Sequence, residues 1–361
     1  MRRTLFLLLF TLFLGGCRNP QSGTSATAAG LPNGSGTRVR NLEGPISGMY
    51  QDLNGEYWFF HREKGVYRYS GAHLILYTAE DGLCSTRILG IQEGAQGELY
   101  FDTPEGVCRF NGHTFSKLPL AGADHPDGGW RLQPGDLWFR MGWDHPGPFR
   151  FDGEFLHPLS LPKNAQEAHF RKAFPNASHN PYGLFSLYRD PTGPLWFGTA
   201  DLGLYQYDGQ TLRWIYDKPL TETPGGGAFG IRSIARDQQG RYWVNTARTA
   251  FRASQNPAKG PGLQPLGLQQ QAGFNTEEDL YFLDILPTPD GELWMLTFDQ
   301  GLWRSSGDRL VRFMPGKAGS ALKPVFIYQD REGVLWIGTE KNGIYTYNGQ
   351  ALLPAVISVP G

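Results

Sequence analysis

The stretch DREGVLWIGTEKNGIYTYNG, residues 330–349, decides the fold because it returns at residues 190–209 as DPTGPLWFGTADLGLYQYDG. Ten of the twenty positions are identical, and they fall at the same offsets. Two copies of one pattern are either a site that occurs twice or one unit of a repeated structure. Further copies would favour the second explanation, and functional residues would then be expected elsewhere.

The same unit occurs seven times along the chain. A Gly-x-Leu-Trp core, or a close variant of it, marks each copy, and the copies lie 38 to 58 residues apart. The marker aromatic residues are Trp58, Tyr100, Trp138, Trp196, Trp243, Trp294 and Trp336. Periods of about 20 to 50 residues are typical of solenoids and propellers, in which neighbouring units bury one continuous core. The quoted stretch is therefore one structural unit.

Each conserved offset within the unit has a conformational reason. Asp-x-x-Gly, as at 330–333, fits a type I turn, because Asp accepts backbone N–H bonds and Gly takes a positive φ. This turn joins a first strand to the aromatic strand, and a second Gly leads to a third strand and then a fourth. Four antiparallel strands in each of seven units predict an all-β fold, a seven-bladed β-propeller. We place it at residues 39–361, with blades near 46–83, 86–120, 130–162, 184–220, 231–268, 281–316 and 323–357.

The units resemble the two-component regulator propeller repeat, whose consensus is close to D-x-x-G-x-L-W-x-G-T-x-x-G-L-x-x-Y. The blades at 184–215 and 323–352 match it nearly throughout, and the resemblance covers about residues 46–357. In that family such propellers form the periplasmic sensing part of hybrid sensor kinases, and they resemble receptors for glycan breakdown products. The resemblance implies a binding or sensing role, here in a stand-alone member without a kinase.

The N-terminus carries an export signal. Residues 1–17, MRRTLFLLLFTLFLGGC, join two arginines to a short apolar run and a Leu-Gly-Gly-Cys ending. Ten apolar residues are too few to span a bilayer. The ending resembles the bacterial lipobox, which implies a lipid-modified Cys17; alternatively, an ordinary signal peptide is cleaved nearby and Cys17 is incidental. Residues 18–38 are small and polar and predict a flexible linker. We therefore expect a lipoprotein held in the cell envelope, at the outer membrane.

Composition limits the classes of partner. The chain has 361 residues, of which 40% are hydrophobic, and 33 basic residues nearly balance 34 acidic ones. No basic surplus indicates nucleic-acid binding. We expect a monomeric propeller without a cofactor, whose partner is an unknown ligand, such as a glycan, or an envelope protein.

Function is expected where the units differ, on loops that need not maintain packing. Three residues after the marker aromatic, five units carry Thr, whereas His61 and Met141 break the ring. We consider His61 a candidate ligand-binding residue at the channel mouth; the alternative is a surface turn residue. The turn of blade three is longer than the others and carries Arg140, Trp143 and His145.

A long insertion, LPKNAQEAHFRKAFPNASHNPYG (residues 161–183), follows blade three. Asn164 and Glu167 resemble a helix N-cap with a reciprocal acid, which predicts a short helix ended by Pro175. His169, Arg171 and His179 lie on this insertion and are further candidates for ligand binding. Aromatic, Arg and His side chains together stack on sugars or bind anionic ligands. The alternative is a solvated lid helix.

Other constellations are weaker. His145, His169 and His179 lack the close spacing of dependable metal sites, so we expect no metal. The acidic run Glu277, Glu278 and Asp279 is typical of a solvated loop. Cys84 and Cys108 could pair in an oxidising compartment, or Cys108 could remain a buried free thiol.

Three functional hypotheses follow. The first is a membrane-tethered binding or sensing propeller. The second is a propeller enzyme, a lyase or a glycan-active enzyme, in which His61 with Glu340, or His145, would supply a pair at the channel mouth. The third is a scaffold subunit of an envelope complex. Binding is favoured, because the repeats specify the fold and no sharp catalytic constellation accompanies them.

Overall fold

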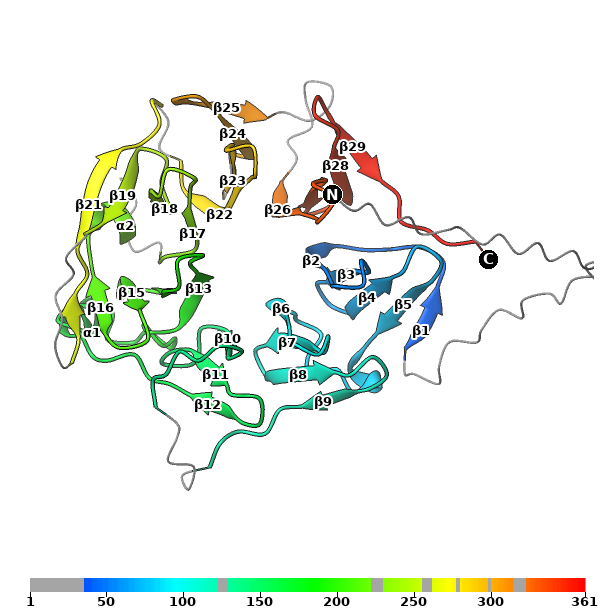
Figure 1. The fold of residues 1–361 in the computed structure, drawn as a ribbon, viewed down its shortest axis with the longest axis horizontal. Helices are drawn as coiled ribbons and strands as arrows, with labels where there is room; N and C mark the ends of the chain where they lie inside the picture. Colours follow the sequence, from blue (N-terminus) through cyan, green and yellow to red (C-terminus); the bar gives the residue numbers. More distant parts are fainter. Residues whose placement is uncertain are drawn as a thin grey trace, which may run out of the picture. The chain divides into compact units, whose positions relative to one another are not determined.

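The fold is a ring of seven small sheets. The computed structural model describes residues 36–122, 129–221, 230–254, 262–276, 280–297, 300–313 and 323–360. Within this part the sheets follow one another in sequence order, and the strands β2, β6, β13, β17, β22 and β26 lie nearest the centre (Figure 1). The prediction of an all-β, seven-bladed propeller is confirmed. Cys17 and the acidic run at 277–279 lie outside the described residues.

Among the described residues, blades one, three and four depart from a uniform four strands. Blade one has five strands and includes the N-terminal strand on its outer edge, whereas blade three has three strands among the described residues. The strands of blade one are β1 (Thr37–Val39), β2 (Ile46–Gln51), β3 (Tyr57–His61), β4 (Gly65–Tyr69) and β5 (Leu74–Tyr77). A short 3-10 helix η1 (Ala79–Asp81) precedes blade two, which comprises β6 (Gly90–Glu93), β7 (Leu99–Thr103), β8 (Gly106–Phe110) and β9 (Phe115–Lys117). Blade three comprises β10 (Leu137–Phe139), β11 (Phe149–Phe151) and β12 (Leu156–Pro158). Strand β1 starts within the last two residues of the predicted linker.

Blades four to seven follow the helix α1 (Gln166–Ala173). Blade four contains β13 (Leu184–Arg189), β14 (Leu195–Thr199), β15 (Leu204–Tyr207), β16 (Leu212–Ile215) and a parallel fifth strand β20 (Gln264–Pro265). After helix α2 (Lys218–Thr221), blade five contains β17 (Ile234–Arg236), β18 (Tyr242–Val244), β19 (Thr249–Ala253) and β21 (Leu268–Ala272). Blade six contains β22 (Phe282–Pro287), β23 (Leu293–Thr297), β24 (Leu302–Ser306) and β25 (Arg309–Phe313). Blade seven contains β26 (Pro324–Gln329), β27 (Leu335–Thr339), β28 (Ile344–Tyr347) and β29 (Leu352–Ala355).

The repeated Asp holds its turn and the marker Trp together. In blade seven the Oδ1 of Asp330 accepts the N–H of Val334 at 2.7 Å, as the predicted turn requires. Its Oδ2 accepts the indole N–H of Trp336 at 2.7 Å, a bond that the sequence pattern did not predict. Asp52 and Asp237 accept the indole N–H of their own blade's Trp at 2.9 Å in the same way. In these three blades a buried hydrogen bond thus joins the Asp to the Trp six residues later.

The marker Trp packs between blades. Trp58 of blade one is 1% exposed and meets Phe101 and Phe110 of blade two with ring centroids 5.4 Å apart. Trp336 of blade seven meets Tyr57 of blade one at 5.4 Å. Large aromatic side chains dominate the energy of such interfaces, since each buries about 150–250 Å².

The first and last blades meet through both side chains and backbone. Strand β2 contacts β26, and the Tyr57 hydroxyl donates to Asp330 at 3.0 Å. Near the chain ends, the backbone N–H of Leu42 bonds to the carbonyl of Ile357 at 3.0 Å, and that of Val359 bonds to Arg40 at 2.9 Å. In the part of the chain that the structure describes, blades one and seven share no strand, and an isolated antiparallel bridge joins Asn41 to Ser358.

Among the described residues, neither helix has the length or the apolar content that crossing a bilayer requires.

Candidate functional site

A cavity of about 470 Å³ lies at the centre of the ring. Its walls come mainly from the innermost strands β6, β13, β17 and β22, and from the loop that follows β10. The polar and charged residues on its walls include Asp102, Arg140, Tyr188, Arg232 and Asp284. Ligand pockets commonly have volumes of about 300–1,000 Å³ with a few convergent polar groups, so this cavity is the candidate site.

Arg140, a residue singled out from the sequence, lines this cavity. Its Nη1 donates to the carbonyl of Phe185 at 2.6 Å and its Nη2 donates to the carbonyl of Leu89 at 2.7 Å. Leu89 leads into blade two and Phe185 lies in blade four, so one guanidinium joins the two blades that flank its own. Two of its donors thus hold the cavity wall in place.

Asp102 fixes the turn that carries Arg140. Its two carboxylate oxygens each accept a backbone N–H at 3.0 Å, one from Arg140 and one from Met141. Met141 has φ of 51°, in the left-handed region that residues other than glycine rarely occupy. Burial raises the pKa of Asp102, against the opposing effects of Arg140 and His145. The long turn of blade three is therefore held by a carboxylate from blade two.

Aromatic and cationic side chains alternate beside the cavity. The guanidinium of Arg232 lies over the ring of Phe185, 4.2 Å from its centroid. Trp143 meets the same ring edge-on at 5.7 Å, and Arg87 lies 5.1 Å from the Trp143 ring. Trp143 is 41% exposed, so the sequence-predicted aromatic residue of the blade-three turn does reach the surface next to the cavity.

Asp284 projects from β22 into the cavity because its cross-strand pair contains no glycine, whereas the equivalent pair in other blades does. The residues that pair at this level of the first two strands are Gly48 with Phe60, Ser186 with Gly198, and Phe326 with Gly338. In these blades one member is glycine, and a Cβ there would collide with the partner's side chain. In blade six the pair is Asp284 with Leu296, and neither is glycine. Asp284 follows a β-bulge and is exposed to the cavity.

The electrostatics of Asp284 reflect its position. The surrounding blades shield its carboxylate from water, and this desolvation raises the pKa of Asp284 to about 6. The N–H of Ile285, 2.9 Å from Oδ1, and the charge of Arg140 oppose this rise. The group therefore titrates close to neutrality.

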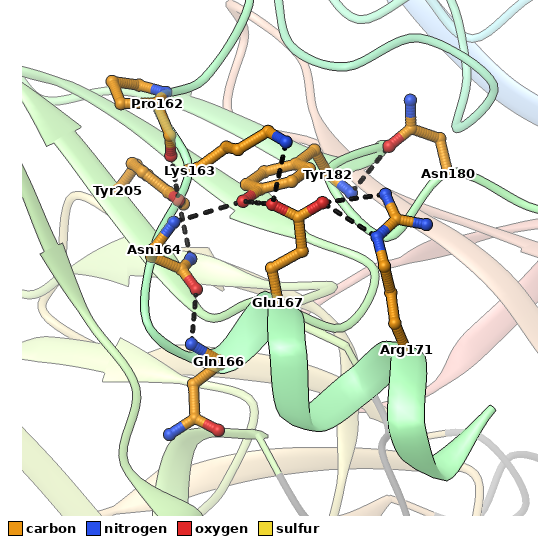
Figure 2. A network of polar contacts seen from close by, with 9 residues as sticks. All are labelled: Pro162, Lys163, Asn164, Gln166, Glu167, Arg171, Asn180, Tyr182 and Tyr205. Atoms are coloured by element: carbon orange, nitrogen blue, oxygen red, sulfur yellow. Dashed lines mark hydrogen bonds and ion pairs between the residues drawn. The ribbon is translucent and has the colours of Figure 1, made fainter. Parts of the chain in front are cut away.

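The insertion after blade three forms the predicted helix, but its capping differs from the prediction. Asn164 does accept the N–H of Gln166 at 2.9 Å, whereas Glu167 makes no reciprocal bond to Asn164. Instead, Glu167 is buried and accepts from Arg171 at 2.8 Å and from the Tyr182 hydroxyl at 3.1 Å (Figure 2). The prediction of a capping box was wrong because tertiary donors compete for the carboxylate. This network anchors α1 to blade four.

A second cavity of about 570 Å³ lies beside the end of α1. Phe170 is buried, Phe174 is 53% exposed, and their ring centroids are 5.4 Å apart. The sequence-predicted His179 lines this cavity with Asp201, and their side chains are 2.6 Å apart. His169 is exposed on α1, and Arg171 is held by Glu167. Of the insertion candidates, His179 lines one of these two cavities.

His61 is the last residue of β3 and is not among the residues that line either cavity. It is 3% exposed, and its Nδ1 accepts the N–H groups of Glu63 and Lys64 at 3.0 and 2.9 Å. At the equivalent position Thr199 accepts the N–H of Leu202 at 2.9 Å. Burial, together with the nearby Lys64, lowers the pKa of His61. The imidazole therefore caps a turn, as the threonine hydroxyls do in other blades.

His145 contacts Phe149, with ring centroids 4.8 Å apart, and is close enough to lower the pKa of Asp102. It thus lies near Asp102 of the cavity wall, whereas His179 lines the second cavity. The part of the chain that the structure describes contains no group of three or more His, Cys, Asp or Glu side chains placed to hold a metal ion.

Cys84 and Cys108 form a disulfide. Of the two alternatives that the sequence left open, pairing is the one observed. The bond ties the loop before blade two to that blade's third strand, β8.

Sequence reasoning missed Arg232 and Asp284, although one signal was available. Two residues after the marker aromatic, the two best repeats have glycine, but the less regular blades have Asp102, Arg140 and Asn245. Each of these side chains bonds to backbone beyond its own strand; Asn245, for example, accepts the N–H of Arg232 at 2.9 Å. Two of these departures from glycine, Asp102 and Arg140, line the cavity.

Comparisons with known proteins agree with the fold. Residues 323–341, which cover β26 and β27, match the family described as two component regulator propeller. No curated protein matches the sequence. The chain is similar to an extracellular domain assigned to a hybrid two component system of B. thetaiotaomicron, with 18% identity and a TM-score of 0.58 over 84% of this chain and 40% of that one.

Two other solved structures are similar. PorZ, a surface component of the type-IX secretion system of Porphyromonas gingivalis, has 15% identity and a TM-score of 0.55 over 85% of this chain and 47% of that one. Virginiamycin B lyase from Staphylococcus aureus has 12% identity and a TM-score of 0.53 over 86% of this chain and 98% of that one. The chain spans less than half the length of PorZ and of the sensor domain. At these identities the likeness establishes the shared fold alone.

Proposed function

We propose that this protein is an extracytoplasmic binding propeller that holds a small ligand in its central cavity and is tethered to the membrane through a lipid on Cys17. The observation that carries the proposal is the cavity itself. Its walls bring together charged side chains at positions where the blades depart from their shared pattern. Residues that a repeat does not need for packing are the ones available for binding.

Export and tethering are supported by two features. The Leu-Gly-Gly-Cys ending after an apolar run is typical of lipoproteins, and the disulfide between Cys84 and Cys108 suits an oxidising compartment. Metabolic labelling with a fatty acid tests the tether. We expect label on the wild type and none on Cys17→Ala, with Cys84→Ser as a control that keeps the label; an unlabelled wild type contradicts the tether.

Ligand binding is tested by a thermal-shift screen with mono- and disaccharides, amino acids, peptides and nucleotides, followed by calorimetry on each hit. Arg232→Ala removes a charge from the cavity wall and should weaken a true ligand about tenfold or more. Lys172→Ala, on the exposed surface of α1, should leave affinity unchanged.

A compound whose affinity is unchanged in Arg232→Ala but lost in Phe174→Ala would place the site in the cavity beside α1 instead. If no hit responds to cavity variants, the proposed site is wrong.

A further inference from the structure

Several polar side chains on the walls of the central cavity are already bonded to the backbone. Both oxygens of Asp102 accept backbone N–H groups, and both terminal nitrogens of Arg140 donate to backbone carbonyls. The amide of Gln92 donates to the carbonyl of Trp138. These side chains hold the blades together at the wall, so a ligand must be recognised by other groups.

Asp284 occupies a position that is serine in the two preceding blades. Ser186 of blade four and Ser233 of blade five lie at the same level of the innermost strand. Their hydroxyls donate to backbone carbonyls, Ser186 to that of Ile231 at 2.7 Å and Ser233 to that of Phe282 at 3.1 Å. An ionised carboxylate has no hydrogen to donate, so Asp284 cannot form the equivalent bond. Its side chain is exposed to the cavity instead.

Asp284 keeps acceptor capacity toward the cavity. A carboxylate has about four lone-pair positions. Within the described ranges, its hydrogen bond to the N–H of Ile285 uses one of them, and the charge of Arg140 acts on it from a distance, without an ion pair. The charge of Arg140 is itself opposed by that of Asp102, which lies closer to its backbone. A donor group on a ligand can therefore reach Asp284.

The strands beside Asp284 supply no counterion to it. Strands β17 and β26 pack against β22, and β23 pairs with it. The sequences of β23 and β26 contain no Asp, Glu, Lys, Arg or His. The charged residue of β17, Arg236, has its guanidinium 6.0 Å from the ring centroid of Tyr242. An ionised Asp284 therefore leaves a negative charge facing the cavity.

The same cavity offers apolar surface to the rest of a ligand. Leu89, Phe185 and Leu286 line it and are half-buried. The guanidinium of Arg232 lies 4.2 Å from the centroid of the Phe185 ring and so fixes the ring from one side. Apolar area removed from water contributes about 25 cal/mol per Å². A short apolar body joined to a cation would use both kinds of wall.

We propose that the central cavity binds a small organic amine, whose ammonium group lies against the carboxylate of Asp284 and whose apolar body lies against the wall around Phe185. This inference rests on the proposed function and names the class of its ligand. A neutral ligand would desolvate the carboxylate without supplying a counterion, which is costly, and an anion would be repelled. An ammonium group supplies both charge and hydrogen-bond donors. The volume of about 470 Å³ suits a ligand of this size.

The test uses amines and alcohols that differ only in the charged end. The probes are n-butylamine, cyclohexylamine and 2-phenylethylamine, each paired with the alcohol of the same skeleton and titrated calorimetrically into the full chain. At least one amine should bind about tenfold or more tightly than its alcohol, because a hydrogen bond between charged groups is stronger than one to a neutral donor. If every alcohol binds as well as its amine, the proposal is overturned.

Two variants assign this preference to one carboxylate. In Asp284→Asn each amine should bind like its alcohol, whereas Asp284→Glu should keep part of the preference. Asp308→Asn is the matched control, since it makes the same chemical change at an exposed residue of blade six, between β24 and β25 and outside the cavity lining. Far-UV circular dichroism checks that each variant keeps the propeller. A preference that survives in Asp284→Asn places the ammonium group elsewhere and overturns the proposal.

The affinity for the amine should also depend on pH. Because the pKa of Asp284 is about 6, lowering the pH from about 7.5 to about 5 should protonate most of the carboxylate and weaken the amine about tenfold. The alcohols should show no such change, and neither should the amines with Asp284→Asn. That variant also distinguishes Asp284 from the imidazole of His145, which lies near Asp102. An amine affinity that is equal at both pH values contradicts the proposal.

The failures of the two proposals are distinguishable. Because Arg232 fixes the ring of Phe185, Arg232→Ala should weaken amines and alcohols alike, so it tests the site and not the ammonium group. If no amine is preferred while another compound binds in a manner sensitive to cavity variants, the amine is wrong and the binding site stands. If no compound responds to any cavity variant, both are wrong.

Discussion

Asp330→Ala should be among the most destabilising substitutions outside the apolar core. The carboxylate is 6% exposed and serves three donors from two blades. It accepts the N–H of Val334 at 2.7 Å, the indole N–H of Trp336 at 2.7 Å and the hydroxyl of Tyr57 at 3.0 Å. Alanine leaves all three without their acceptor.

The magnitude follows from the burial of these donors. Trp336 is 8% exposed, so its unsatisfied indole N–H should cost about 1–3 kcal/mol. Tyr57 and Val334 are half-buried and can regain water, so each should cost about 1 kcal/mol. The sum, about 3–5 kcal/mol, is a large part of the roughly 5–15 kcal/mol that stabilises a typical protein.

Urea unfolding followed by tryptophan fluorescence and circular dichroism measures this loss. Because Tyr57 belongs to blade one and Asp330 to blade seven, Tyr57→Phe and the double variant should reveal a coupling of about 1–2 kcal/mol. Tyr242→Phe is the matched control, since Tyr242 bonds to Asp190 of blade four at 2.6 Å. A loss below about 1 kcal/mol for Asp330→Ala, or no coupling to Tyr57, would refute the assigned role in closing the ring.

Four further predictions concern other parts of the molecule. Asp284→Asn should raise the thermal midpoint by about 1–3 °C at neutral pH, but not at pH 4 or below. The pKa of Asp284 in the folded state is raised to about 6, so the wild type loses stability as the pH rises from about 4 to 6. Equal pH profiles of the midpoint for the variant and the wild type would contradict this. Cys84→Ser removes the disulfide to Cys108, 24 residues away, and should lower the free energy of unfolding in urea by about 3 kcal/mol. An unchanged midpoint would mean that the disulfide does not form. Gly198→Ala should cost about 1–3 kcal/mol, because its Cβ would meet a side chain of the paired strand; a neutral result would show that the pair can adjust. Glu167→Gln should increase hydrogen exchange in α1 while changing global stability by less than about 1 kcal/mol, and unchanged exchange would show that the carboxylate does not anchor the helix.

Local pattern was sufficient to predict the architecture. The Asp-x-x-Gly turn, the marker Trp and the second Gly are set by φ, by hydrogen bonding over a few residues and by packing that every blade repeats. The position of Trp58 against blade two and the hairpin at Asp330 could therefore be predicted from the sequence. The hydrogen bond between the Trp indole and the Asp carboxylate could not be predicted from the sequence, because a spacing of six residues does not show which atoms meet.

The candidate site was predicted only in part. Arg140 and Trp143 stood out because the blade-three turn departs from the repeat, and both lie at the cavity or beside it. Arg232 and Asp284 have no local motif around them, so nothing distinguished them from surface charges. His61 stood out for replacing a threonine, yet the structure gives it the same turn-capping role.

The sequence by itself determined that seven similar units would pack into a ring, since one hydrophobic pattern recurs with one set of turns. Only the tertiary structure decided which side chains share the central cavity. Arg140, Arg232 and Asp284 come from three blades; the first two are 92 positions apart along the chain and the last two are 52 positions apart. Their meeting depends on how the first strands face the axis after the ring closes, and on a glycine that is missing opposite Asp284. Both are non-local consequences of packing, which no spacing along the chain records.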